Sequence, residues 1–244
     1  MVFKFLGAAA STAFLLTGVP ASAVTLVLDS FSSEQWVQDG PTSDNPNASE
    51  LADMGILGGA RDLAVRNTKA DGNNTATSEM RVTGGNLKFS NVAGARGTGW
   101  MTYDGIDGDG VNVATTGLGG VNLNIGRNPY FYFAAPANIV FDHLAAFSVT
   151  AWDMTGKTVT YNELLAPGYN PNLYFSEFTG DAGFDFGNLG ALQFMISSSD
   201  TADSVDGAIS QIEVRASVVP LPATALLLMG GVGGLAVLRR RKQA

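Results

Sequence analysis

Hydrophobic residues in the middle of the chain occur in short runs of alternating apolar and polar positions, separated by Gly, Asn, Asp and Pro. Alternation over about four to eight residues is typical of half-buried β-strands. No segment of comparable length has helical periodicity. The pattern therefore predicts an all-β fold, an antiparallel two-sheet sandwich of the jelly-roll type. The predicted strands are residues 24–29, 61–67, 78–82, 86–90, 98–103, 121–125, 130–133, 146–153, 158–161, 172–178, 191–197 and 209–215.

Two polar stretches interrupt this pattern without dividing the body. Residues 38–50 contain Pro41, Asn45 and Pro46, which indicates a surface loop, followed by a short helical turn near residues 49–54. Residues 198–206 are expected to form the loop before the last strand. No convincing linker occurs between residues 24 and 218, so we expect a single sandwich domain over 24–218.

The N-terminal 23 residues have a different, continuous hydrophobic pattern. Lys4 precedes an apolar stretch that runs to Val19, and the small residues Ala21 and Ala23 follow it. This order is that of a secretory signal peptide, with cleavage expected after Ala23. Residues 1–23 are thus predicted to direct export.

The C-terminal residues 219–244 are predicted to insert in a membrane. Residues 223–238 are uncharged and would span roughly 24 Å as a helix, slightly less than the hydrocarbon core of a bilayer. The cations that follow favour the cytoplasmic side, which leaves the body outside the cytoplasm. These cations are Arg239, Arg240, Arg241 and Lys242.

The apolar segment is preceded by a short motif made of Val219, Pro220, Leu221, Pro222 and Ala223. Motif, apolar helix and basic end together resemble the VPLPA variant of the PEP-CTERM sorting tail of exported Gram-negative proteins. The resemblance implies recognition and removal by an exosortase, a transpeptidase-like enzyme of the inner membrane. Leu221 stands where the name-giving motif has Glu, which leaves open which sorting enzyme recognises the tail. After processing, the protein is expected at the cell surface or outside the cell.

The body between the two end segments is strongly acidic. Residues 24–218 carry all 22 acidic residues but only 9 of the 14 basic ones, a formal charge of −13. This balance disfavours nucleic acid and anionic lipid as partners and favours divalent cations. The chain has no Cys, so its core or a metal, rather than disulfides, must stabilise the exported body.

Segments of the body also resemble galactose-binding-like jelly rolls, the fold of many carbohydrate-binding modules. The resemblance is carried by residues 28–31, 189–196 and 205–209 and has no diagnostic motif. It implies a fold more than a function. Residues 58–63, with the sequence Gly-Gly-Ala-Arg-Asp-Leu, resemble a segment that recurs in exported proteins with this type of tail.

No catalytic constellation is evident. The single histidine, His143, excludes a zinc site built on several imidazoles, and without a G-x-S-x-G elbow it is interpreted as an ordinary surface or strand-end residue. A nucleophilic Cys is excluded by composition. Glycosidases need only two carboxylates, but nothing in the sequence distinguishes one acidic pair. The protein is therefore expected not to be an enzyme.

One acidic cluster is a candidate calcium site. Asp104, Asp107 and Asp109 alternate with glycines over residues 104–110, and flexible carboxylates can converge on Ca²⁺. The spacing is not that of an EF-hand. The alternative is an Asp-Gly-rich connection between strands, in which the carboxylates accept local backbone hydrogen bonds. Both interpretations remain open, and calcium is the one cofactor that the sequence suggests.

Aromatic residues are the candidate contacts for sugars, because sugar rings stack on exposed Trp and Tyr. The aromatic residues considered are Trp36, Trp100, Tyr103, Trp152 and Tyr169. Trp100 and Trp152 lie inside predicted strands and are expected in the core. Trp36 and Tyr169 border polar loops and are expected to be exposed, which makes them the candidate glycan contacts.

Three functions fit these observations. The first is a non-catalytic surface or matrix protein associated with exopolysaccharide, as the tail resemblance implies. The second is a specific carbohydrate-binding module, and the third is a secreted glycan-active enzyme. The expected partners are a sorting transpeptidase, the membrane through residues 223–238, and exopolysaccharide.

Overall fold

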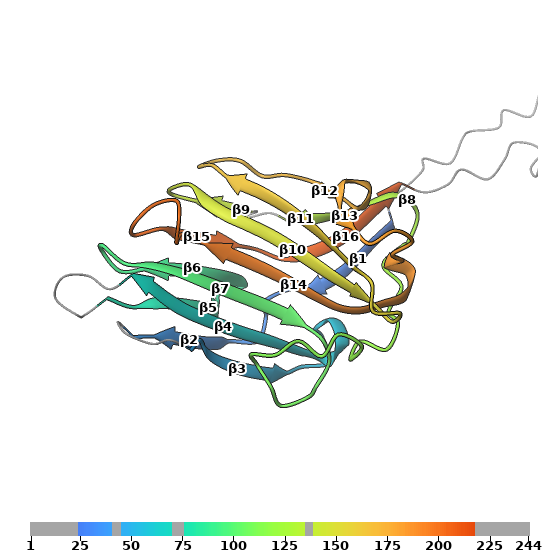
Figure 1. Cartoon of the computed structure of the whole chain (residues 1–244), viewed down its shortest axis with the longest axis horizontal. Coiled ribbons are helices and arrows are strands. Elements are labelled where there is room, and N and C mark those ends of the chain that lie inside the picture. The colour runs from blue at the N-terminus through green and yellow to red at the C-terminus, as the bar shows by residue number, and fades with distance from the viewer. Residues whose placement is uncertain (1–23, 41–44, 70–75, 135–138, 218–244) are drawn as a thin grey trace, which may run out of the picture.

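The computed structural model describes residues 24–40, 45–69, 76–134 and 139–217 (Figure 1). The predicted signal peptide, with Ala21 and Ala23, and the predicted sorting tail, residues 219–244, lie outside the described residues. Within the described ranges, no helix has the length and apolar character needed to cross a membrane.

The described part of the chain is built from antiparallel β-strands and three short 3-10 helices. The helices are η1 (Leu57–Gly59), η2 (Phe175–Glu177) and η3 (Phe186–Asn188). The strands are β1 (Val24–Asp29), β2 (Gln35–Asp39), β3 (Asn47–Ala52), β4 (Ala60–Lys69), β5 (Ser78–Thr83), β6 (Asn86–Asn91), β7 (Arg96–Tyr103), β8 (Arg127–Phe133), β9 (Ile139–Phe141), β10 (Ala145–Asp153), β11 (Thr158–Leu165), β12 (Leu173–Tyr174), β13 (Thr179–Gly180), β14 (Leu189–Ser197), β15 (Asp206–Ile209) and β16 (Ile212–Ser217).

A seven-stranded sheet forms one layer, in the order β13-β11-β10-β14-β7-β4-β3. Its long strands run side by side across Figure 1. The second layer contains a five-stranded sheet, β2-β5-β6-β15-β9, and a four-stranded sheet, β1-β16-β8-β12. The all-β antiparallel prediction is confirmed, although the structure has three sheets where the sequence predicted two.

The second layer is divided because its pairing is interrupted between β15 and β16. Ser210 and Gln211 separate the two strands, and here the backbone N–H of Ala134 donates to the Gln211 carbonyl at 2.9 Å. The hydroxyl of Ser210 donates to the carbonyl of Ala134. The chain thus passes from the five-stranded to the four-stranded sheet without leaving the layer.

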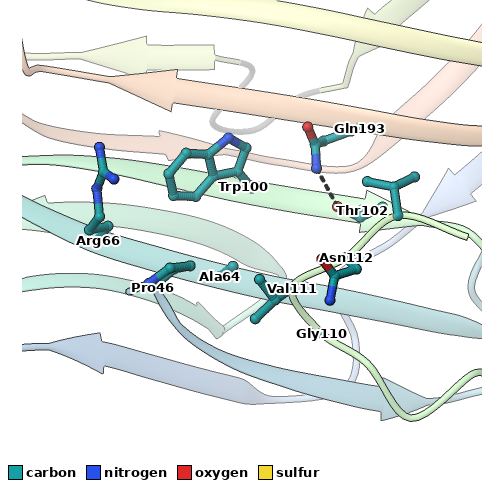
Figure 2. Close-up of a pocket in the computed structure, with 10 residues that line it drawn as sticks. Pro46, Ala64, Arg66, Trp100, Thr102, Gly110, Val111, Asn112 and Gln193 are labelled. Atoms are coloured by element: carbon teal, nitrogen blue, oxygen red, sulfur yellow. Dashed lines mark hydrogen bonds between the residues drawn. The ribbon is translucent and has the colours of Figure 1, made fainter. Parts of the chain in front are cut away.

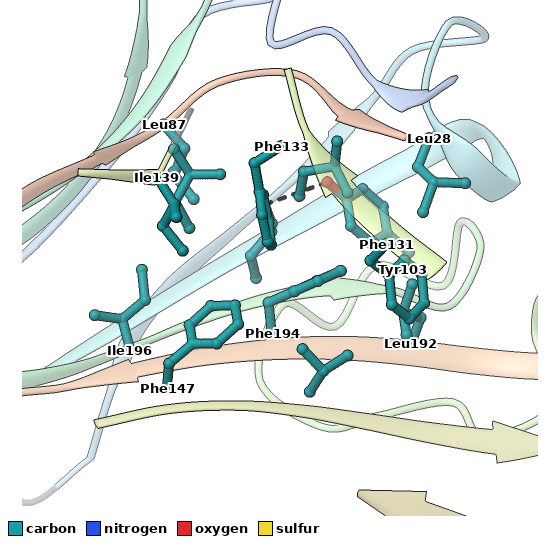
Figure 3. Packing of buried hydrophobic residues seen from close by; sticks show 14 of the residues in the cluster. Leu28, Leu87, Tyr103, Phe131, Phe133, Ile139, Phe147, Leu192, Phe194 and Ile196 are labelled. Carbon is teal, nitrogen blue, oxygen red and sulfur yellow. Dashed lines mark hydrogen bonds between the residues drawn. The ribbon is translucent and has the colours of Figure 1, made fainter. Parts of the chain in front are cut away.

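The core lies between the layers and is rich in phenylalanine (Figure 3). Phe194 of the seven-stranded sheet meets Phe131 and Phe133 of the opposite layer, with ring centroids 5.6 and 6.5 Å apart and the rings nearly perpendicular. Edge-to-face pairs of this kind add about 0.5–1.5 kcal/mol each beyond their buried area. Phe147 completes the group beside Phe133 at 6.0 Å. This cluster holds the two layers together without disulfides.

Several predictions from the sequence are wrong in detail. Residues 47–52, expected to be loop and helical turn, form the edge strand β3, which pairs with β4 along its whole length. Residues 121–125, expected to be a strand, contribute only the bridge between Val121 and Leu189. Of residues 172–178, only Leu173 and Tyr174 are in a strand, and a 3-10 turn follows them.

Candidate functional site

The outer face of the seven-stranded sheet carries polar side chains around two tryptophans. In β7 the buried Met101 and Tyr103 point into the core, so Trp100, which directly precedes Met101, points outward. In β10 the same alternation places Trp152 outward, because Val149 and Ala151 are buried. Both tryptophans are partly exposed. The prediction that they belong to the core is therefore wrong.

The strand register arranges these outward residues in rows across the sheet. Trp100 lies opposite Met195 of β14, and Met195 lies opposite Ser148 of β10. The next row passes from Thr102 to Gln193, where the Gln193 amide donates to the Thr102 hydroxyl at 3.0 Å. An indole and an amide thus lie on neighbouring rows of one surface.

Trp100 borders a recess of about 440 Å³ on this face (Figure 2). The floor comes from β4, β7 and β14, and the connection between β7 and β8 forms a wall. Figure 2 shows the indole of Trp100 between the guanidinium of Arg66 and the amide of Gln193. The lining residues are Pro46, Ala64, Arg66, Trp100, Thr102, Gly110, Val111, Asn112, Val113 and Gln193.

The wall is fixed to the sheet by carboxylates. Glu50 of β3 accepts hydrogen bonds from the backbone N–H groups of Asp107 and Gly108 at 2.9 and 2.8 Å. These two bonds lower the pKa of Glu50, because they stabilise its ionised form. Asp104 accepts from the N–H of Ala114 at 2.7 Å. Carboxylates at both ends of the wall therefore hold it in place.

Asp109 organises the tip of the wall. Its Oδ1 accepts from the backbone N–H groups of Val111 and Asn112 at 3.0 and 3.1 Å, and its Oδ2 accepts from the Asn112 side chain at 2.7 Å. The Asn112 side chain and these backbone donors keep the pKa of Asp109 below its usual range. The tip that lines the recess is thus a turn closed by its own side chain.

Two glycines allow the wall to lie against the sheet. A Cβ on Gly110 would come within 3.0 Å of the backbone of Ser49 in β3, and a Cβ on Gly117 would overlap the carbonyl oxygen of Asp104. Neither neighbour is a flexible side chain that moves aside easily. Close backbone approach therefore requires glycine at position 117 and favours it at position 110.

A buried pair of carboxyl groups, Asp62 of β4 and Asp104, lies beneath this wall. The two residues are 2% and 1% exposed, and among the described residues Oδ1 of each has no hydrogen-bond partner. Burial first, and then the neighbouring Asp104, raises the pKa of Asp62 to about 9. Burial also raises the pKa of Asp104. At neutral pH the pair therefore holds a proton between its members.

The candidate calcium ligands are not gathered around one point. Asp104 is buried beneath the wall, whereas Asp107 is exposed and Asp109 bonds to the tip. Within the described ranges, no three His, Asp or Glu side chains form a group that could hold a metal ion. The local backbone hydrogen bonds agree with the alternative interpretation of residues 104–110. Calcium binding stays a prediction.

The other candidate residues lie away from the recess. Trp36 on β2 and Tyr169 after β11 are 57% and 45% exposed, as their neighbouring polar residues predicted. Tyr103 is completely buried. His143 is exposed beside Asp142, with Nδ1 3.0 Å from its carboxylate. The contact of Trp36 or Tyr169 with a glycan stays a prediction.

The Gly-Gly-Ala-Arg-Asp-Leu segment supplies a structural centre that the sequence did not reveal. Arg61 is fully buried and donates to Asp29 at 2.7 Å, to Gln35 at 2.8 Å and to the carbonyl of Ser33 at 2.8 Å. The next residue, Asp62, points to the opposite face and joins the carboxyl pair. Arg61 therefore stabilises the core, and the next residue, Asp62, supports the wall.

Comparisons with known proteins identify no family. No family model matches the chain, and neither does any curated protein. Among solved structures, the solution structure of CtCBM11 is similar, with a TM-score of 0.39 and 12% identity over 80% of this chain and 96% of that one.

Two further solved structures are also similar. The family 11 carbohydrate-binding module of the cellulosomal cellulase Lic26A-Cel5E of Clostridium thermocellum has a TM-score of 0.31 and 12% identity, over 75% of this chain and 94% of that one. The enzymatically active domain of bacteriophage CBA120 tailspike protein 4 has a TM-score of 0.27 and 12% identity, over 75% and 19%. Similarity at this level is too weak to transfer a ligand or an activity. What the comparisons establish is a set of structural neighbours that includes carbohydrate-binding modules.

Proposed function

We propose that this protein is an exported, non-catalytic carbohydrate-binding protein whose jelly-roll body holds a glycan chain in the recess beside Trp100. The observation that carries the proposal is the recess itself, which combines a partly exposed indole with polar side chains on a rigid sheet. Sugar rings present apolar C–H faces and polar hydroxyl edges. A site for them therefore needs an aromatic surface surrounded by hydrogen-bonding groups.

The polar groups of the recess have the required chemistry. Arg66 supplies only donors, whereas the amides of Gln193 and Asn112 both donate and accept. Sugar hydroxyls also do both, so these groups match a neutral glycan without excluding a charged one. Trp152 on the same outer face offers a second indole to a chain longer than one sugar. The lining supplies these hydrogen-bonding groups without an Asp, Glu or His side chain.

Trp100→Ala is expected to weaken glycan binding about tenfold or more, because a Trp at the centre of a site supplies much of its binding energy. The measurement is isothermal titration of the full-length chain with oligosaccharides selected on a glycan array. Met54→Ala removes a side chain that is 92% exposed and serves as the matched control. Unchanged binding by Trp100→Ala together with loss in Tyr169→Ala would place the site on the loop after β11 and contradict the proposal.

The cellular setting is proposed from the sequence of the two ends. A cleaved signal peptide and a sorting tail deliver the body to the cell surface or the surrounding matrix, where exopolysaccharide is the available glycan. Mature protein is then expected to end within residues 219–223. Intact-mass analysis of surface-released protein tests this expectation, and a mass that includes Arg239 to Lys242 would refute it.

A further inference from the structure

A second aromatic surface lies on the outer face of the five-stranded sheet. Trp36 of β2 points away from the core, because its neighbours Gln35 and Val37 are buried. Its indole N–H donates to Oε2 of Glu79 at 3.1 Å, so the orientation of the ring is fixed although the side chain is 57% exposed. The ring therefore offers an ordered face to solvent.

Two cations continue the row that begins at Trp36. Trp36 lies opposite Arg81 of β5, and Arg81 lies opposite Lys88 of β6. Both cations are exposed. Like charges directly opposite each other on neighbouring strands destabilise a sheet. Folding alone thus does not explain this placement.

The charge of the surrounding body makes these cations unusual. Only 9 basic residues accompany the 22 acidic ones of residues 24–218. Even so, within the part of the chain that the structure describes, neither Arg81 nor Lys88 forms an ion pair. Their charges remain available to an anion from outside.

This surface is separate from the recess beside Trp100. Met80 of β5 and Phe89 of β6 point inward, where they pack against Gly99 of β7. Trp36 and Trp100 each point the other way, out of their own layer. The two indoles therefore lie on opposite outer surfaces of the sandwich.

We propose that Trp36, Arg81 and Lys88 form a second glycan site, which takes a polysaccharide carrying carboxylate groups. The sugar ring stacks on Trp36, and the carboxylate of that sugar or its neighbour pairs with Arg81 and Lys88. A shallow recess of about 190 Å³ supports this placement, since Trp36 and Arg81 both line it, together with Glu34, Gln35 and Val82.

Two sites on opposite surfaces let one molecule hold two glycan chains. This consequence, unlike the second site itself, rests on the function proposed for the Trp100 recess. A body that binds one chain on each side cross-links a polysaccharide network without forming an oligomer. The second site thereby gives the proposed matrix association a physical mechanism.

Affinity electrophoresis of the full-length chain tests the second site, with polygalacturonate as the carboxylated polymer and dextran as the neutral one. Polygalacturonate is expected to retard the wild-type chain, and Trp36→Ala to weaken the retardation about tenfold. The double variant Arg81→Gln with Lys88→Gln is expected to abolish the retardation and its salt dependence. Trp100→Ala is expected to retain it, which separates this test from that of the proposed function.

Three results would overturn the second site. The first is that polygalacturonate does not retard the wild-type chain. The second is that it retards the Trp36 variant and the Arg81/Lys88 variant as strongly as the wild-type chain. The third is that polyacrylate, which carries carboxylates but no sugar ring, retards the wild-type chain as strongly as polygalacturonate does. Circular dichroism of each variant shows whether the fold is retained. Because all three side chains lie on the surface, loss of binding with an unchanged spectrum supports the site.

Discussion

Arg61→Met is expected to lower the free energy of unfolding by about 3–5 kcal/mol, because it leaves the carboxylate of Asp29 buried without its cation. Asp29 is 1% exposed and would retain only the N–H of Phe31 and the hydroxyl of Tyr103 as donors. Gln35 and the carbonyl of Ser33 would lose their guanidinium donors as well. Urea unfolding followed by far-ultraviolet circular dichroism measures the change.

The matched control for this variant is Arg127→Met, at an exposed position of β8, which is expected to change stability by no more than about 0.5 kcal/mol. The double variant Asp29→Asn with Arg61→Met removes both charges and should recover part of the loss. A loss below about 1 kcal/mol in Arg61→Met would show that the buried pair contributes little to the fold.

Asp62→Asn is expected to raise the free energy of unfolding by about 1–3 kcal/mol at pH 7, because it removes the cost of burying two adjacent carboxyl groups. The folded protein raises the pKa of Asp62 to about 9, whereas an unfolded Asp titrates near pH 4. The wild-type chain therefore loses stability as the pH rises from about 4 to about 9. An Asn amide in the same place donates to Asp104 without needing a proton from solvent.

The advantage of Asp62→Asn should accordingly be absent near pH 4, grow with pH and become constant above about pH 9. Urea unfolding at several pH values, without added calcium, measures it. Asp109→Asn is the control, and it is expected to lower the free energy of unfolding. The pKa of Asp109 is lowered in the folded protein, and loss of its carboxylate removes hydrogen bonds from the wall. A variant no more stable than wild type at any pH would contradict the shared proton.

Alternation in the sequence identified most long strands because their inward residues are large and apolar, as with Phe147 and Val149 in β10. It missed β2 because two of its inward residues are Gln35 and Asp39, which are buried to satisfy Arg61 and the backbone of Asn67. An interior hydrogen-bond network of this kind has no signature in a hydrophobic pattern. The edge strand β3 was missed for a similar reason, since none of its side chains is fully buried.

The candidate site was harder to predict than the fold. In β7, Gly97 and Gly99 occupy inward positions because the side chains of Ser78 and Met80 fill the space beside them. Because glycine has no apolar side chain, the inward positions of β7 did not stand out in the sequence, and Trp100 was assigned to the core instead. In β10 the alternation itself shows that Trp152 points outward, because Trp152 is an odd number of residues away from the inward-facing Phe147 and Val149. The recess itself joins residues from β4, β7, β14 and a distant connection, which only the strand register brings together.

The positions of the tryptophans also determine what the intrinsic fluorescence of this protein measures. The chain has three, and Trp36, Trp100 and Trp152 all lie on outer faces while phenylalanine fills the centre. Native indole emission therefore comes from a partly hydrated environment and changes little when the core opens. The emission changes more when a sugar covers an indole. The intrinsic fluorescence of this protein is therefore expected to follow glycan binding on its outer faces more than unfolding of its core.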